Sequence, residues 1–438
     1  MATLPVRDGA SIEASLAALV ELAQRTGRWG DPGIRRRVGL LVARATGLAA
    51  STSLESPSLA PAEIEAMTAE LGRHADALGL ELLGDAALSR TEVWGRDGAG
   101  GLGNASILDH WAQPRATQVV VDDDPRSMPP PPSGGDPALQ HCLDEAAKAV
   151  LNNSTFGPRV LDPHWWEDLV WGQVLASIVE DPASAASVFE ALGSSLLPGP
   201  FVATALVGDA QEVAARHGVV TVIDRQSAGS HPQVVCFPRD ATVVLVVPGP
   251  REGALPATLV PMSSLTINEL ASPLDPLTPV GLLEAPAPDG PHELAATPDV
   301  LRRRGAVLTA AMQVGLAARS LEVARQHLAL RGAAGGQVVE LRRRMVELCM
   351  ARDAVRGALT AKGTAVEPTQ GRSSTQLDWL RSATAKVTAD AVAHAATELA
   401  WSLDPGDHQR MLTRCRAVVH GASFGTRAQL TEVLATLA

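Results

Sequence analysis

The sequence predicts a mainly helical fold with a small β-rich insert. Apolar residues recur at helical spacing over most of the 438 residues. A compact group of β-branched segments lies between residues 218 and 291. A proline- and glycine-rich stretch at residues 125–137 has the composition of an extended linker and separates the first third of the chain from the rest. The length is sufficient for two or three domains with a sizeable core.

Residues 1–124 are expected to form a helical bundle. The helix that begins at Ser11 has its apolar residues close to a 3.6-residue period, and Gly30-Asp31-Pro32 follows its end. Pro61 fits the first turn of a later helix. The expected helices cover residues 11–26, 35–48 and 60–83.

After the linker, residues 138–217 are expected to be helical, residues 218–291 to form a reduced β-domain, and residues 292–438 to form a second helical bundle. Long helices joined by short loops are typical of bundle packing. The expected helices are 138–151, 165–180, 183–192, 210–217, 300–330, 337–362, 374–403, 407–419 and 427–437. The expected strands are 219–223, 233–237, 241–247, 258–262 and 264–270, followed by proline-rich loops up to Pro291.

Composition disfavours several classes of function. The net charge of −11 disfavours binding to nucleic acid and to anionic membranes. The chain has no apolar stretch of the roughly 20 residues that cross a bilayer, and its start does not resemble a signal peptide, so a cytoplasmic protein is expected. The absence of tyrosine and the excess of arginine over lysine suggest a bacterial source.

The cysteines predict neither a metal site nor a disulfide framework. No CxxC spacing occurs, and the four residues are far apart. They are expected to be reduced, small apolar core residues. They are Cys142, Cys236, Cys349 and Cys415.

Several segments carry a resemblance to a known family. Residues 196–205 (LLPGPFVATA) and 311–321 (AMQVGLAARSL) resemble the end of the N-terminal helical domain and the first C-terminal bundle helix of bacterial acyl-CoA dehydrogenases. Residues 21–38 resemble the C-terminal bundle of the same family. The resemblance implies acyl-CoA dehydrogenase-like helical bundles with a reduced β-domain between them, in which the tail of one unit is fused to an abbreviated second unit. It also implies an apolar or acyl substrate, and a homo-oligomer or a heteromer with a paralogue.

The flavin-binding features of that family are largely missing from the matching positions. Residues 331–337 replace an Arg…Phe-Gly…Phe-Gln segment and keep only Gln337, while residues 401–406 replace a Gly-Gly loop. In the first unit, Asp122, Asp123 and Asp124 stand near the expected glycine loop, where three carboxylates would repel a diphosphate. We therefore expect no cofactor, with FAD as the alternative.

The family's catalytic carboxylate has a counterpart in Asp407, followed by His408. A carboxylate in an apolar pocket has a raised pKa and can act in acid–base chemistry. The alternative is structural, because Asp407 follows Pro405-Gly406 and can cap the next helix.

Aromatic residues provide candidates for substrate binding. Trp165 and Trp166, with Trp401 and Gln337, could line an apolar pocket, although such tryptophans more often pack in a core. The arginine runs 302–304 and 342–344 are expected on solvated helix faces, with binding of an anion such as a CoA phosphate as the alternative.

Two further motifs are weak. The GxGxxG at residues 98–103, with Asp122 downstream, lacks a convincing preceding strand and further βαβ units, so a glycine-rich loop is the better interpretation. The GxSxG at residues 421–425 follows an expected helix and not a strand, which favours an inter-helix loop over a nucleophile elbow.

Three functional hypotheses follow. The first is a cofactor-independent cyclase or isomerase that acts on a long apolar, polyketide-like substrate in a biosynthetic pathway, since such chemistry requires shaping and limited proton transfer. The second is an FAD-dependent acyl-CoA dehydrogenase that introduces an α,β double bond, alone or in a heteromer. The third is a non-catalytic partner subunit.

Overall fold

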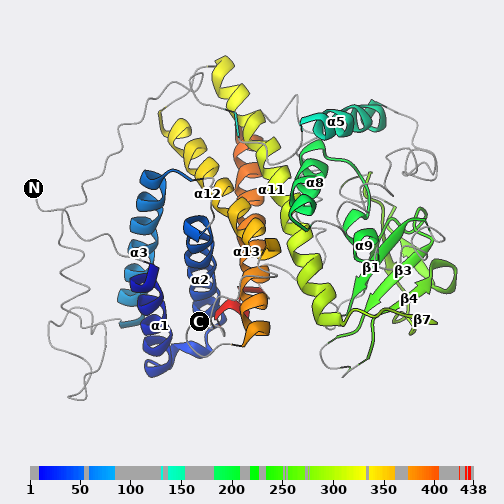
Figure 1. The fold of residues 1–438 in the computed structure, drawn as a ribbon, viewed down its shortest axis with the longest axis horizontal. Helices are drawn as coiled ribbons and strands as arrows, with labels where there is room; N and C mark the ends of the chain where they lie inside the picture. Colours follow the sequence, from blue (N-terminus) through cyan, green and yellow to red (C-terminus); the bar gives the residue numbers. More distant parts are fainter. Residues whose placement is uncertain are drawn as a thin grey trace, which may run out of the picture.

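The computed structural model shows a helical body joined to a smaller sheet region (Figure 1). Its description covers residues 9–53, 59–83, 130–131, 137–152, 182–207, 218–225, 233–249, 252, 255–271, 275, 277–331, 335–360, 373–403, 424, 430–431 and 433–435.

Three helices near the N-terminus form one packed group. Proline opens both α2 and α3, where its missing N–H and fixed φ suit the first turn. Asp31 caps α2 by accepting a hydrogen bond from the Gly33 N–H at 2.7 Å. The elements are α1 (Gly9–Arg25), the 3-10 turn η1 (Arg28–Gly30), α2 (Pro32–Ser53) and α3 (Pro61–Leu83).

The core of this group includes residues from the other end of the chain. Leu19, Val38 and Leu78 are buried together with Val387 of α13 and with Leu434. The N-terminal helices therefore do not enclose a separate core, and they share one with the C-terminal part.

The second helical group is built around a long central helix. Helix α11 (Pro298–Arg331) packs along α8 (Pro182–Ser195), α12 (Gly335–Thr360) and α13 (Ser374–Leu403), while α5 (Pro137–Asn152) lies against α8. Gly315 lets α11 approach α8 closely, since a Cβ added there would lie 1.8 Å from the Glu190 carbonyl oxygen. The short helix α9 (Phe201–Leu206) connects this group to the sheets.

Two small sheets lie at the end of the molecule opposite the N-terminal helices (Figure 1). The first has the order β1-β3-β4-β7, with β1 parallel to β3 and the other pairs antiparallel, and the second has the order β2-β6-β5. The strands are β1 (Val220–Asp224), β2 (Val234–Cys236), β3 (Val243–Val247), β4 (Thr258–Pro261), β5 (Ile267–Glu269), β6 (Val280–Leu283) and β7 (His292–Glu293); the 3-10 turn η5 (Met262–Ser264) follows β4.

The position of strand β3 explains why its sequence, Val-Val-Leu-Val-Val, is apolar throughout. Side chains alternate between the faces of a strand. Val243, Leu245 and Val247 pack with the helices, whereas Val244 and Val246 pack with the second sheet. The first sheet is thus covered on both faces, and every residue of β3 is buried.

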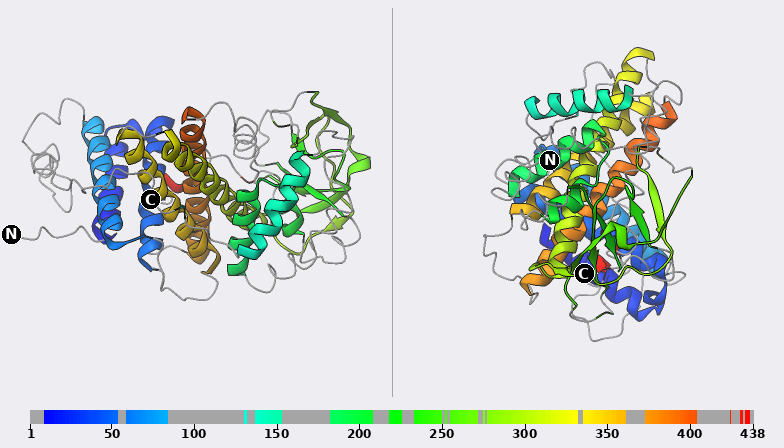
Figure 2. Two further views of the ribbon diagram at one scale, coloured as in Figure 1. Left: turned by 90° about the horizontal axis from the view of Figure 1, so that it is seen from above. Right: turned by 90° about the vertical axis from the view of Figure 1, so that its right-hand side faces the viewer.

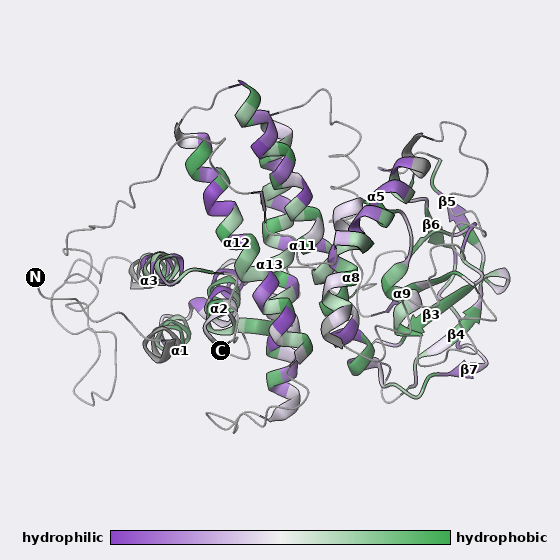
Figure 3. Cartoon of the chain, turned by 45° about the horizontal axis from the view of Figure 1, so that its top comes forward, coloured by the Kyte–Doolittle hydropathy of each residue, from purple (hydrophilic) through white to green (hydrophobic). Residues whose placement is uncertain are grey.

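The sheets lie at one end of the molecule, and the N-terminal helices lie at the other (Figure 2). Figure 3 shows β3 as hydrophobic, while α11 and α13 carry hydrophobic and hydrophilic residues in alternation. None of the described helices has the length and apolar character needed to cross a membrane.

The predicted fold class, mainly helical with a small β-region between helical parts, is confirmed. The proline-rich loops expected up to Pro291 contain strand β6, and α9 was not expected either. The prediction that all cysteines are core residues is wrong for Cys142, which is exposed. The domain boundaries given above remain predictions.

Candidate functional site

A cavity of about 390 Å³ lies where α2 and α3 meet α12 and α13. This volume is within the range of small-molecule sites. The lining residues on each helix follow helical spacing, as in Arg37, Leu40, Leu41 and Arg44 of α2, which lie on one face. The lining is completed by Ala43, His74, Ala77, Leu78, Arg344, Glu347, Met350, Val387, Thr388, Ala391 and Val392.

Most of the cavity wall is apolar. Leu41 and Leu78 are buried on the side of the N-terminal helices, and Met350, Val387 and Val392 are buried on the opposite side. The cavity therefore presents hydrocarbon surface to a ligand, and its polar groups are concentrated on α2, α3 and α12.

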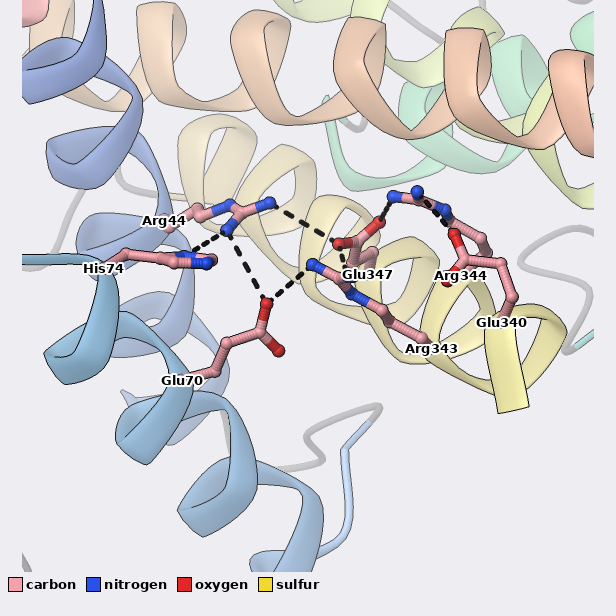
Figure 4. A network of polar contacts seen from close by, with 7 residues as sticks. All are labelled: Arg44, Glu70, His74, Glu340, Arg343, Arg344 and Glu347. Carbon is pink, nitrogen blue, oxygen red and sulfur yellow. Dashed lines mark hydrogen bonds and ion pairs between the residues drawn. The ribbon is translucent and has the colours of Figure 1, made fainter. Parts of the chain in front are cut away.

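A network of ion pairs joins these three helices (Figure 4). The Arg343 guanidinium on α12 donates to Glu70 of α3 at 2.7 Å. Arg344 pairs with Glu347 at 2.6 Å and with Glu340 at 2.5 Å, both on its own helix. These short contacts tie each of the three carboxylates to an arginine of α12.

Arg44 occupies a different position in this network. Its guanidinium nitrogens lie 3.6 Å from Glu347 and 3.9 Å from Glu70, beyond hydrogen-bond distance. Its one hydrogen bond in the described network goes to the ring of His74, at 3.1 Å. Arg44 is therefore the arginine with the loosest carboxylate contacts in the network, and its side chain is 30% exposed.

The contact with Arg44 determines the tautomer of the His74 ring. Arginine has no acceptor, so Nδ1 of His74 must accept the hydrogen bond, and the neutral ring then carries its proton on Nε2. Partial burial, and after it the Arg44 guanidinium, lower the pKa of His74, against the opposing effect of Glu70. His74 thus presents a neutral ring with an N–H donor at the cavity.

Glu347 is the one carboxylate among the described lining residues. Its Oε2 accepts a hydrogen bond from Arg344, whereas its Oε1 is buried and has no hydrogen-bond partner among the described residues. A buried acceptor without a donor is costly. A ligand or water donor in the cavity would relieve this cost.

None of the residues that the sequence singled out is among the described residues that line this cavity. Asp407, His408, Trp165 and Trp166 lie outside the described residues. Trp401 is half-buried near the end of α13 and packs against the main core, while Gln337 is exposed in the first turn of α12. Neither Trp401 nor Gln337 lines the cavity, and the roles of all six residues remain predictions.

The prediction that both arginine runs lie on solvated helix faces is wrong in part. Arg302 is only 3% exposed and donates to Asp224 at the end of β1 and to the Pro248 carbonyl. Arg343 and Arg344 belong to the network described above. A signal was present in the sequence, because Glu340, Arg344 and Glu347 have the i,i+4 and i,i+3 spacing of helical ion pairs.

Two threonine hydroxyls of the sheet region form hydrogen bonds within the protein. The Thr258 hydroxyl accepts a hydrogen bond from the Gly290 N–H, and the Thr242 hydroxyl donates to the Val219 carbonyl. These two hydroxyls are used within the protein.

No family model matches this sequence. No curated protein matches it either. Solved structures do match in fold at low identity, and they include acyl-CoA dehydrogenase-like proteins, the group that the sequence resembles.

Three of these structures are representative. The ChsE4–ChsE5 complex from Mycobacterium tuberculosis is 16% identical, with 68% of this chain and 91% of that chain covered and a TM-score of 0.42. The Tcur3481–Tcur3483 steroid ACAD is 17% identical, with 68% and 96% covered and a TM-score of 0.47. PigA with FAD and proline is 13% identical, with 69% and 97% covered and a TM-score of 0.48. These likenesses concern the fold alone.

Proposed function

We propose that this chain is a cofactor-independent cyclase or isomerase that acts on an apolar, polyketide-like substrate. The observation that carries the proposal is the meeting of a hydrocarbon-lined cavity with a neutral His74 whose N–H donor is set by Arg44. Apolar walls shape a flexible chain, and a fixed donor stabilises developing negative charge on oxygen.

The chemistry needs no oxidant. A carboxylate removes a proton from a carbon next to a carbonyl, and the electron pair moves to the carbonyl oxygen, which accepts a hydrogen bond from Nε2–H of His74. In an isomerisation the proton returns at another carbon. In a cyclisation the enolate carbon attacks a second carbonyl, which takes up the proton. Asp407, the residue that the sequence singles out, and Glu347 in the lining are the two candidate carboxylates.

The direct test is incubation of the full chain with poly-β-ketone substrates in D₂O, without flavin. We expect deuterium incorporation or a cyclised product of unchanged oxidation state. His74→Gln should lower the rate about 10²-fold or more, the scale seen when one oxyanion donor is removed. Comparison of Asp407→Asn with Glu347→Gln identifies the carboxylate, and an unchanged rate removes that residue from the mechanism.

The second candidate is an FAD-dependent dehydrogenase, alone or in a heteromer. It is favoured by the exposure of Arg331 at the end of α11 and of Gln337 in the first turn of α12, which bound the segment that stands in the place of the family's flavin-gripping region. Flavin absorbance in the purified protein, with oxidation of a saturated thioester, would replace the first proposal with this one. No turnover in either assay would favour a non-catalytic partner subunit.

A further inference from the structure

We propose that the ligand of the cavity carries a free carboxylate and that Arg44 is the group that receives it. This inference rests on the proposed function for the identity of the site, and it names the class of substrate. The observations that carry it are the charge of the lining, the loose contacts of Arg44 and the apolar character of the remaining wall.

The lining is positively charged in an acidic protein. Arg37, Arg44 and Arg344 face the cavity with a single carboxylate, Glu347, whereas the whole chain has a net charge of −11. Two of these arginines have close partners, since Arg37 pairs with Glu81 at 2.5 Å and Arg344 pairs with Glu347 at 2.6 Å. Arg44 is the remaining cation.

Arg44 can accept a new anion without a close ion pair being broken. Its contacts with Glu347 and Glu70 are 3.6 and 3.9 Å long, and those carboxylates keep their short hydrogen bonds to Arg344 and Arg343. The guanidinium has five N–H donors in a planar fork, and such a fork matches a carboxylate. The hydrogen bond to His74 uses one of these donors.

The neutral state of His74 makes the recognition selective. A protonated ring would place a second cation against Arg44, and Nδ1 could no longer accept the hydrogen bond from Arg44. With His74 neutral, the positive charge at this point of the wall is that of Arg44 alone, with Glu347 and Glu70 at 3.6 and 3.9 Å from it. This arrangement suits a monoanionic carboxylate better than a dianionic phosphate.

The rest of the ligand must be apolar. Leu41, Leu78, Val387 and Val392 provide hydrocarbon surface close to the arginine cluster. A cavity of about 390 Å³ accommodates a medium-sized molecule. We therefore assign to the cavity a keto acid or fatty acid of medium chain length, bound as the free acid and not as a thioester.

The experiment measures binding to the full chain by titration calorimetry with four probes of one chain length: octanoate, 1-octanol, octylammonium and octyl phosphate. We expect octanoate to bind at least about tenfold more tightly than 1-octanol, the scale of one charge-assisted hydrogen bond. Octylammonium should bind most weakly. Tighter binding of octyl phosphate than of octanoate would overturn the assignment of a carboxylate.

Variants test whether Arg44 is the receptor. Arg44→Gln should abolish the preference for octanoate over 1-octanol while 1-octanol still binds, and Arg44→Lys should keep part of it. Arg25→Gln, which alters an exposed pair with Glu21 on α1, is the matched control and should keep all of it. A preference that persists in Arg44→Gln overturns the proposal.

Salt provides a readout that needs no variant. The preference for octanoate should shrink as salt is raised, because Arg44 is partly exposed, whereas 1-octanol binding should not weaken. Equal binding of octanoate and 1-octanol at low salt, or no binding of either, also overturns the proposal. Octanoate binding with no turnover of any substrate would instead refute the proposed reaction and leave the carboxylate site in place.

Discussion

The Nη1 atom of Arg44 on α2 lies 3.1 Å from the Nδ1 atom of His74 on α3. This contact fixes the tautomer of the ring and joins two helices at the wall of the cavity. The same two helices are also connected to α12, because Arg44 lies 3.6 Å from Glu347 and Glu70 accepts a hydrogen bond from Arg343. A single pair thus serves both helix packing and the proposed chemistry.

The lowered pKa of His74 predicts a pH-dependent stability. The unfolded chain has the ordinary histidine pKa of about 6.5, so on acidification it binds a proton before the native ring does. The His74 contribution is therefore complete above that pKa, and it is lost as the pH falls toward the lower native value. We expect the fall in Tm between about pH 7.5 and pH 5.5 to be smaller in His74→Gln. The control His141→Gln, at an exposed position of α5, should follow the unchanged protein.

The buried pair of Arg352 and Glu190 predicts a strong stability effect. The Arg352 Nε lies 3.0 and 3.1 Å from the two Glu190 oxygens, and the side chains are 3% and 8% exposed. Glu190→Leu should lower the free energy of unfolding by about 3–5 kcal/mol, because it leaves a buried guanidinium without its counter-charge. Addition of Arg352→Met should recover most of this loss in urea unfolding. A double variant as unstable as the single one would contradict the explanation.

The close approach of α8 and α11 predicts a steric effect at Gly315. An alanine Cβ there would lie 1.8 Å from the Glu190 carbonyl oxygen, so the two backbones must separate. Gly315→Ala should cost about 1–3 kcal/mol or more in urea unfolding. Gly336→Ala, at a helical position with nothing within 4 Å of the added carbon, should be neutral or slightly stabilising.

The cysteines differ in predicted reactivity toward thiol reagents. Burial raises the pKa of the Cys236 and Cys349 thiols to about 11, whereas Cys142 is exposed on α5. In a Cys415→Ser background, which removes the cysteine outside the described residues, one thiol should react rapidly at mildly alkaline pH. A further Cys142→Ser change should abolish this rapid phase, as measured by mass spectrometry. Rapid labelling of Cys349 would contradict the burial described above.

Local sequence signals predicted the long helices well. The helix expected at residues 374–403 matches α13 at both ends. Its start is marked by Ser373 and Gln376, which form reciprocal hydrogen bonds there. The apolar run around Val244 likewise predicted strand β3, because the pattern of a strand is local in the sequence. The order of helices, small sheets and helices could therefore be predicted from the sequence alone.

Features that depend on distant contacts escaped prediction. Strand β6 follows Pro279 and includes Gly281, and its strand character comes from pairing with β2 and β5. Arg302 is buried because Asp224, 78 positions away, supplies its counter-charge. The cavity is formed by four helices from two parts of the chain, so no single segment carries its pattern.

The shared core of the N-terminal helices has a consequence for biosynthesis. Leu19 and Leu78 leave the ribosome long before Val387 and Leu434, which complete their burial. At about 5–20 residues per second, the early helices wait for tens of seconds with an apolar face unsatisfied. Nascent chains of this protein should therefore depend on chaperones that bind such a face until translation ends.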